Sequence, residues 1–315
     1  MRIVFLGSGA FAIPSLEALL DAGHEVAALV TQPDRHKGRG QAVAPPPIRP
    51  VAEARGIPVL QPPRVREPEA RDSLRALRPE LQVVVAFGQI LPRAVIDIAP
   101  LGTVNVHASL LPKLRGAAPV QWAIASGETE TGASTMLIDE GLDTGPVLLQ
   151  CGTPIGPEET AGELEPRLAR LGAEVLLDTV DGLRAGRLRP RPQDHARATR
   201  APLLRKEDGR LDWSRGAREL HRRIRGFHPW PGCFTSLEGR TVKVLRARVV
   251  EDSAVPPASD AEPGQVRAIE SEGIVVACGE GSHLRLVEVQ PESRRAMPAA
   301  AFAAGARLRP GARLG

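Results

Sequence analysis

The chain has 315 residues, of which 42% are hydrophobic and 25% are charged, and its formal net charge is +4. This length and composition predict an ordinary globular protein with two domains and exclude a disordered or fibrous chain. The three cysteines, Cys151, Cys233 and Cys278, are far apart and form no C-x-x-C pair. We therefore expect neither a disulfide framework nor a zinc site, and we expect a reducing, cytoplasmic location.

Membrane insertion and export are not expected either. No apolar run approaches the roughly 18 residues that are needed to span a bilayer. The first expected strand begins at Arg2, which leaves no room for a signal or transit peptide. We expect a monomer that has no membrane partner and works where it is made.

The first hundred residues alternate between short apolar runs and helical patterns. Residues 2–6 are typical of a buried strand, and Pro14 and Gly23 mark the beginning and the end of the helix that follows. Further strands are expected at 25–31, 58–60 and 82–87, and further helices at 49–55, 68–77 and 91–98. This alternation predicts a doubly wound α/β domain with a mostly parallel sheet, in which ligands bind beyond the carboxyl ends of the strands.

The turn after the first strand matches a dinucleotide-binding fingerprint. Gly7-x-Gly9-x-x-Ala12 follows the strand, and Asp34 lies 22 residues beyond Ala12. These features would favour an NAD-dependent oxidoreductase. However, Asp34 falls past the end of its strand, behind Pro33, and similar glycine turns occur where a helix merely packs on a strand. The oxidoreductase is kept as a remote alternative.

A basic segment, Thr-Gln-Pro-Asp-Arg-His-Lys-Gly-Arg-Gly, occupies residues 31–40. Arg35, Lys37 and Arg39 lie within five positions, glycines flank Arg39, and three prolines follow at 45–47. This composition predicts a projecting loop without regular structure. Such a loop beside a catalytic cleft can contact phosphates, and a solvated surface loop is the alternative.

Polar side chains gather at the ends of two strands between residues 103 and 145. Asn105 and His107 share one face of a strand expected at 103–108, because side chains alternate along a strand. A second strand, expected at 133–138, ends in Asp-Glu-Gly-Leu-Asp-Thr-Gly, whose glycines allow a loop that returns Asp143 towards His107.

An amide, an imidazole and a carboxylate in this arrangement suit acyl transfer. The amide and the imidazole can stabilise the oxygen of a tetrahedral intermediate, and the carboxylate can orient the imidazole and assist proton transfer. Taken singly, Asn105 can instead be a strand-end cap, His107 a core histidine and Asp143 a turn residue.

The motifs of this stretch occur in a characteristic order: Asn-x-His, Ser-Leu-Leu-Pro, Arg-Gly-x-x-Pro and Asp-x-Gly-x-Asp-Thr-Gly. In that order they resemble the signature of the folate-dependent formyltransferases, and the resemblance extends more loosely over nearly the whole chain. It implies transfer of a formyl group from 10-formyltetrahydrofolate to an amine, without a metal, and with Asn105, His107 and Asp143 as the catalytic group. It also implies that the loop at 109–112 lies beside the folate; its residues are Ser109, Leu110, Leu111 and Pro112.

A second part of the folate site is expected after the strand at 82–87, at the same edge of the sheet. We expect the apolar groups there to form a wall of the folate pocket, in a segment made of Phe87, Gly88, Gln89, Ile90 and Leu91.

Within the family, Leu-Arg-Gly-Ala-Ala-Pro-Val-Gln at residues 114–121 is most similar to the members that act on methionyl-tRNA. That resemblance implies that the basic segment inserts along the acceptor arm of the initiator tRNA, with Arg39 as the matching arginine. A formyltransferase for an amino sugar nucleotide shares Asn-x-His and Ser-Leu-Leu-Pro and is the closest alternative. A non-catalytic RNA-binding protein, the other alternative, would not need the three polar residues.

The rest of the chain indicates a second, basic domain. After a strand at 147–151 and a helix at 160–183, residues 190–207 are Arg/Pro-rich and predict a linker between a catalytic domain at 1–189 and a domain at 208–315. Five short strands expected at 234–237, 241–250, 264–269, 273–277 and 284–289 indicate a small OB-like β-barrel.

Charge supports a nucleic-acid surface in this part of the chain. Residues 210–248 carry 10 Lys+Arg against 3 Asp+Glu, and residues 184–206 carry 8 against 1. Such stretches often bind polyanions. Since the chain has no Tyr, contacts to phosphates are expected rather than stacking on bases.

Overall fold

The computed structural model describes residues 1–37, 42–250 and 261–315. They form two compact units. Unit 1 comprises Met1–Pro119, Glu130–Pro154 and Glu165–Pro202, and unit 2 comprises Val120–Thr129, Ile155–Leu164 and Leu203–Gly315. Two short stretches between residues 120 and 164 thus belong to the unit that contains the C-terminal end of the chain.

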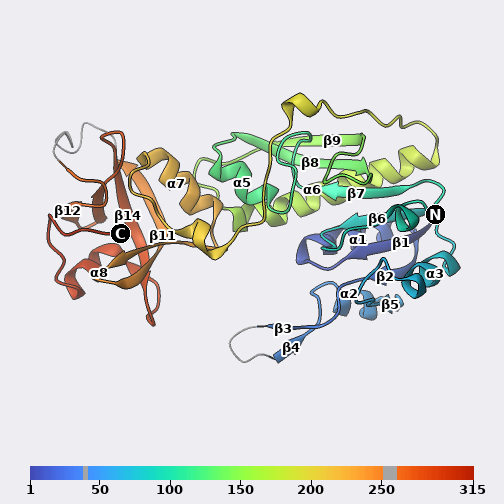
Figure 1. The fold of residues 1–315 in the computed structure, drawn as a ribbon, viewed down its shortest axis with the longest axis horizontal. Helices are drawn as coiled ribbons and strands as arrows, with labels where there is room; N and C mark the ends of the chain where they lie inside the picture. Colours follow the sequence, from blue (N-terminus) through green and yellow to red (C-terminus); the bar gives the residue numbers. More distant parts are fainter. Residues whose placement is uncertain (38–41, 251–260) are drawn as a thin grey trace. The chain divides into compact units, whose positions relative to one another are not determined.

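A seven-stranded sheet forms the centre of unit 1, in the order β5-β2-β1-β6-β7-β8-β9 (Figure 1). The strands are β1 (Arg2–Gly7), β2 (Glu25–Val30), β5 (Val59–Leu60), β6 (Leu81–Val85), β7 (Thr103–His107), β8 (Glu130–Leu137) and β9 (Val147–Pro154). The pairs from β5 to β7 are parallel, and β8 and β9 are antiparallel to their neighbours. This confirms the doubly wound, mostly parallel sheet expected from the sequence.

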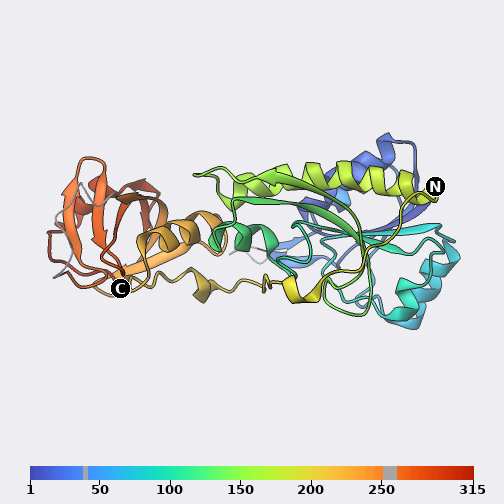
Figure 2. The same cartoon turned by 90° about the horizontal axis from the view of Figure 1, so that it is seen from above.

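Helices cover both faces of this sheet, because side chains that alternate along β1 pack against different helices on the two faces. The helices are α1 (Ile13–Asp21), α2 (Arg49–Ala54), α3 (Pro68–Ala76), α4 (Arg93–Ile96) and α6 (Ala161–Arg184), most of which belongs to unit 1. Ile3 and Phe5 join a core cluster with side chains of α1, α2 and α6. Val4 and Leu6 point to the opposite face and join a cluster with α3 and α4. Figure 2 shows α6, in yellow-green, along one face of the sheet.

The chain order places a topological switch point in the middle of the sheet. It starts at β1, adds β2 and β5 on one side, and then continues with β6 and β7 on the other. At such a point the connections leave in opposite directions, and ligands bind at the carboxyl ends of the strands. Gly7, Val85 and His107 end β1, β6 and β7 at this edge.

The basic segment contains regular structure, so the expectation of a loop without it is wrong. β3 (Arg35–Lys37) and β4 (Ala42–Ala44) pair antiparallel in a two-stranded sheet. Composition did not reveal the pairing because main-chain hydrogen bonds form the ladder, and they require only two extended, antiparallel segments. Residues 38–41, and with them Arg39, lie outside the described residues.

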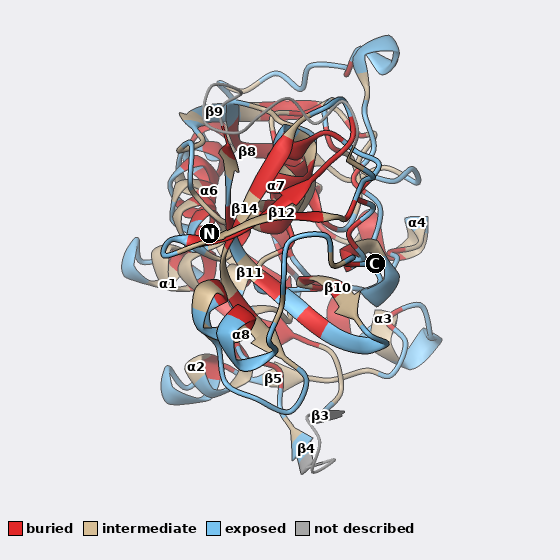
Figure 3. Ribbon diagram, turned by 90° about the vertical axis from the view of Figure 1, so that its left-hand side faces the viewer, coloured by how far each residue is buried: buried red, intermediate tan, exposed pale blue. Residues whose placement is uncertain are grey.

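Unit 2 is built on an antiparallel sheet in the order β10-β11-β14-β13-β12, with β15 paired to β14. The strands are β10 (Cys233–Leu237), β11 (Arg240–Val250), β12 (Val266–Glu270), β13 (Gly273–Ala277), β14 (His283–Pro291) and β15 (Met297–Pro298). The first five correspond to the expected strands, which confirms the small barrel-like domain. Figure 3 shows buried and exposed residues alternating along β11, as in a sheet with one covered face.

Among the described residues of unit 2, helices α7 (Ala217–Gly226), α8 (Ala299–Gly305) and most of α5 (Pro119–Ala125) accompany this sheet. Leu220, His221 and Ile224 of α7 are buried, at the spacing of one helix face. Phe227, which follows α7, meets the ring of Trp122 edge to face at 5.5 Å. Neither β15 nor α8 was expected from the sequence.

Candidate active site

His107 ends β7 as a buried residue, and its main partner is a main-chain carbonyl. Its Nε2 lies 2.9 Å from the carbonyl oxygen of Leu114. Because a carbonyl oxygen only accepts, Nε2 carries a hydrogen and donates it. The other ring nitrogen, Nδ1, lies 3.8 Å from Oδ2 of Asp143. That distance is too long for a direct hydrogen bond but short enough for the carboxylate to attract a proton-bearing ring.

Asp143 lies in the turn after β8, where the loop returns to His107. Its φ is +52°, in the left-handed region that Asp tolerates better than most residues. Its Oδ2 accepts a hydrogen bond of 2.8 Å from the main-chain nitrogen of Gly116, and the side chain is 14% exposed. The structure thus brings together two side chains that are 36 positions apart, with one carboxylate oxygen shared between an amide and the imidazole.

Asn105 lies two positions before His107 on β7 and hence on the same face of the sheet. It is partly exposed and pairs in register with Val84 and Met136 on the neighbouring strands. Within the described part of the chain its side-chain amide makes no hydrogen bond. The amide is therefore free to donate to a ligand at the end of the strand.

The main chain of the loop at 109–112 is held by hydrogen bonds from two side chains, the buried Ser134 and the exposed Gln150. Ser134 Oγ donates to the carbonyl of Ser109 and accepts from the main-chain nitrogen of Leu111. Gln150 Nε2 donates to the carbonyl of Leu111 at 2.9 Å. Ser109 and Leu111 are buried, whereas Leu110 and Pro112 are partly exposed. The loop therefore offers Leu110 and Pro112 to a ligand on a fixed main chain.

The segment at 87–91 divides between core and surface. Phe87 and Leu91 pack in the core cluster with β1, whereas Ile90 is 92% exposed and Gly88 is exposed as well. Gln89 is fixed by its amide, which accepts from the main-chain nitrogen of Val65. An apolar contact with a ligand at this edge is thus available from Ile90 rather than from Phe87.

The paired strands β3 and β4 form what we call the basic hairpin. Gln32 connects this hairpin to the segment at 87–91. Arg35 Nη2 donates to Gln32 Oε1 at 2.8 Å, and Gln32 Nε2 donates to the carbonyl of Phe87 at 3.1 Å. The root of the hairpin is therefore attached to the chain that follows β6. The side chain of Lys37 and the whole of Arg39 lie outside what the structure describes.

Comparison with protein families matches both parts of the chain. The formyl transferase model matches residues 1–180, and the model for the formyl transferase C-terminal domain matches residues 203–307. The chain belongs to the formyl transferase family. It covers 97% of the methionyl-tRNA formyltransferase of Geobacter sulfurreducens and 99% of that of Solibacter usitatus, at 50% and 52% identity over 315 residues.

Solved structures with the formyl transferase fold include an N-formyltransferase from Helicobacter canadensis in complex with folinic acid and dTDP-3-aminofucose. It is 17% identical, its TM-score is 0.66, and the match covers 92% of this chain and 99% of that one. At this identity the likeness concerns the fold.

Membership of the formyl transferase family overturns the oxidoreductase alternative. The acidic residue on which that alternative relied has another partner: Asp34 Oδ1 accepts hydrogen bonds from Gln61 and Arg49. The hydrogen bond from Gln61, together with Arg49, lowers the pKa of the Asp34 carboxyl. The glycine turn at Gly7 serves packing, because a Cβ there would lie 3.0 Å from that of Ala12.

Sequence reasoning missed the contribution of residues 191–201, which we call the strap. The sequence predicts a linker that crosses the first domain there, since it is Arg/Pro-rich and has no period, but it does not indicate what the linker contacts. In the structure the strap lies against residues 113–118 of this formyl transferase, with Ala201 donating to the carbonyl of Arg115 at 2.7 Å. Only Gln193 and Thr199 stand out as polar, uncharged residues in the strap, and no local pattern assigns them a partner.

The described parts of this family member contain no group of three or more His, Cys, Asp or Glu that could hold a metal ion. No helix among the described residues is long and apolar enough to cross a membrane.

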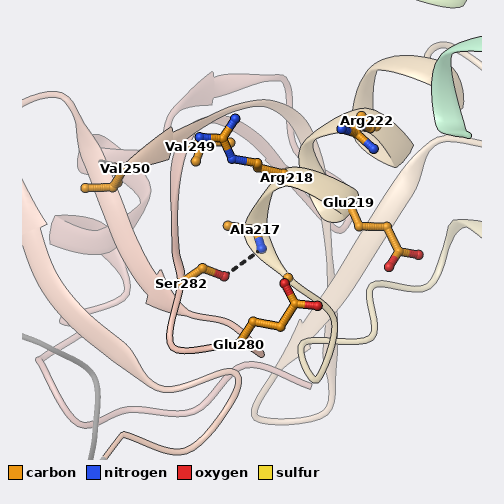
Figure 4. A pocket seen from close by; sticks show the side chains of 9 residues that line it. Ala217, Arg218, Glu219, Arg222, Val249, Val250, Glu280 and Ser282 are labelled. Atoms are coloured by element: carbon orange, nitrogen blue, oxygen red, sulfur yellow. Dashed lines mark hydrogen bonds between the residues drawn. The ribbon is translucent and has the colours of Figure 1, made fainter. Parts of the chain in front are cut away.

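A pocket of about 340 Å³ lies within unit 2 (Figure 4). Ser282 Oγ accepts a hydrogen bond from the main-chain nitrogen of Ala217 at its edge. Its lining consists of Gly216, Ala217, Arg218, Glu219, Arg222, Val249, Val250, Glu280 and Ser282. None of the site residues expected from the sequence is among them, so this pocket is not part of the candidate active site.

Proposed function

We propose that this protein transfers the formyl group of 10-formyltetrahydrofolate to the α-amino group of methionyl-tRNA, the initiator tRNA of translation. The observation that carries the proposal is the identity of 50% over the full chain with a methionyl-tRNA formyltransferase, which includes the C-terminal domain. The residues Asn105, His107 and Asp143, gathered at the ends of β7 and β8, supply the chemistry.

In the proposed reaction the neutral amine attacks the formyl carbon. A bond forms between the amine nitrogen and that carbon, and the formyl oxygen becomes negatively charged. The free amide of Asn105 and a proton on Nδ1 of His107 stabilise this oxygen. Asp143 accepts the proton that the amine loses and passes it, through His107 or water, to the folate nitrogen as the carbon–nitrogen bond of the donor breaks.

The formyl donor is proposed to bind between the loop at 109–112 and the segment at 87–91. Leu110, Pro112 and Ile90 offer exposed or partly exposed apolar surface at the carboxyl ends of β7 and β6. The hydrogen bonds that Ser134 and Gln150 donate to the carbonyls of Ser109 and Leu111 keep the loop in place before the folate arrives. Such preorganisation lowers the entropic cost of binding.

The tRNA is proposed to contact the basic hairpin, through Arg35, Lys37 and Arg39, and the domain at 208–315, which follows the catalytic domain at 1–189 and the segment at 190–207. The excess of 10 Lys+Arg over 3 Asp+Glu in residues 210–248 supports phosphate contacts there. Because its substrate is the initiator tRNA, we also propose that the protein acts in the cytoplasm. We further propose that it is a monomer and has no membrane partner.

A direct comparison of amines tests the proposed function. The purified protein is given 10-formyltetrahydrofolate and either methionyl-tRNA or a dTDP-linked amino sugar, the class of ligand bound by the structural relative. We expect formylated methionyl-tRNA, measured as labelled formyl group that acid precipitates together with the tRNA, and no formylated sugar. Formylation of the sugar alone would contradict the proposal and favour the amino sugar alternative.

Replacement of a hairpin arginine tests the tRNA contact. Arg35→Ala is expected to raise the KM for methionyl-tRNA and to reduce the salt dependence of binding by about one unit of slope, as one phosphate contact is lost. The KM for the folate should not change, which steady-state kinetics at several salt concentrations will show. Arg55→Ala is the matched control, because Arg55 is an exposed arginine paired with Asp21 instead. Equal effects of the two substitutions would contradict the contact.

A further inference from the structure

The strap reaches both members of the His107–Asp143 pair through the loop at 113–118. Thr199 Oγ1 accepts a hydrogen bond of 2.8 Å from the main-chain nitrogen of Leu114, and the carbonyl of Leu114 accepts the Nε2 hydrogen of His107. Gly116, two residues further on, donates its main-chain hydrogen to Asp143. One short loop therefore fixes the imidazole on one side and the carboxylate on the other, and the strap holds that loop.

The side chain of Gln193 connects the same two parts directly. Its Nε2 donates to the carbonyl of Asp143 at 2.9 Å and to that of Gly145 at 2.7 Å. Its Oε1 accepts from Nε and Nη2 of Arg115, at 3.1 Å and 2.7 Å. The side chain is buried, with 8% exposed.

This set of partners fixes the orientation of the amide. Both hydrogens of Nε2 point to carbonyl oxygens, which only accept, and both lone pairs of Oε1 receive hydrogens of a guanidinium, which only donates. A reversed amide would place oxygen against oxygen and hydrogen against hydrogen. Gln193 is therefore a rigid bridge between the turn that carries Asp143 and the loop that carries Leu114 and Gly116.

We propose that Gln193 is a positioning residue for the His107–Asp143 pair: by joining the Asp143 turn to Arg115 it sets the distance and direction of the carboxylate from the imidazole. The proposal rests on the proposed function of that pair in formyl transfer. Nδ1 and Oδ2, 3.8 Å apart, are already beyond direct hydrogen-bond distance, so a further displacement of the turn would weaken the attraction between the carboxylate and the ring. A shift of about 1 Å in such a group can cost about a hundredfold in rate.

Two substitutions of Gln193 test the bridge. Gln193→Leu removes the four hydrogen bonds to Asp143, Gly145 and Arg115, together with the weaker one from Nε2 to Met136 Sδ, at nearly constant volume. Gln193→Glu keeps the acceptor for Arg115 but places an oxygen against the carbonyls of Asp143 and Gly145. Both are expected to lower kcat by about ten- to a hundredfold, while KM for the folate and for methionyl-tRNA stays within about threefold. If Gln193→Leu does not fold, the kcat of Gln193→Glu decides.

Gln82→Ala is the matched control for a purely structural role. Gln82 is also a buried glutamine, and its Nε2 donates to the carbonyl of Val95 and to Thr103 Oγ1. It should lower the melting temperature as much as the Gln193 substitutions while leaving kcat within about twofold. A kcat of the Gln193 variants no lower than that of Gln82→Ala, at a temperature where all are folded, would overturn the proposal.

The activity of the wild-type protein distinguishes a failure of this proposal from a failure of the proposed function. If the wild type does not formylate methionyl-tRNA, the proposed function fails, and the same variants are compared on whichever amine the wild type formylates. A fall in kcat on that amine would still support the bridge. A change confined to KM would place Gln193 in substrate binding and overturn it.

Discussion

His107→Ala is expected to lower kcat for formyl transfer by about two to four orders of magnitude. The substitution removes the ring whose Nδ1 faces Asp143, and with it the proton available to the developing oxyanion. Single-turnover measurement of formyl transfer separates this step from product release. Because His107 and Asp143 act on one proton, the double variant with Asp143→Ala should lose little more than either single variant.

His24→Ala is the control for this experiment. His24 is likewise a buried histidine of unit 1, and burial lowers the pKa of its ring, but its Nδ1 lies 3.4 Å from the N-terminal amine of Met1. It should leave kcat within about twofold. Near-normal turnover in a folded His107→Ala protein would show that the imidazole has no part in the chemistry.

Gly116→Ala is expected to damage both stability and catalysis. Gly116 has a φ of +127°, and a Cβ there would lie 2.4 Å from the carbonyl oxygen of Ala201 in the strap. Backbone strain and this contact together should cost about 3 kcal/mol or more, which corresponds to a fall in Tm of about 6 °C or more. Since Gly116 donates to Asp143, kcat should also fall about tenfold or more.

Gly56→Ala serves as the comparison, measured by thermal unfolding and by steady-state kinetics. Gly56 also has a positive φ, +69°, but no atom lies within 4 Å of an added Cβ. It should cost only about 1 kcal/mol, from the backbone conformation, with unchanged kcat. If Gly116→Ala lowered Tm and kcat no more than Gly56→Ala, the strap would not lie as close to Gly116 as the structure shows.

The fold could largely be predicted from the sequence, because its signals are local. The strand at 273–277 was expected with the limits it has in the structure. Turn residues and the spacing of apolar residues fix such elements within a few positions. The segment at 299–305 was missed because its run of alanines has high helix propensity but no polar face to produce a period. β3 and β4 were missed because pairing of main chains leaves no mark on composition.

The sequence by itself determined the family signature and the three polar residues, since Asn105 and His107 are two positions apart on one strand and glycines surround Asp143. Only the tertiary structure decided which ring nitrogen of His107 is fixed, that Ile90 rather than Phe87 is exposed, and that Gln193 bridges Asp143 and Arg115. Gln193 is 50 positions from Asp143 and 78 from Arg115 in the chain. No periodicity spans such distances: contacts of this kind arise when separately formed segments pack together, and a buried amide must then satisfy its hydrogen bonds with whichever groups the packing brings to it.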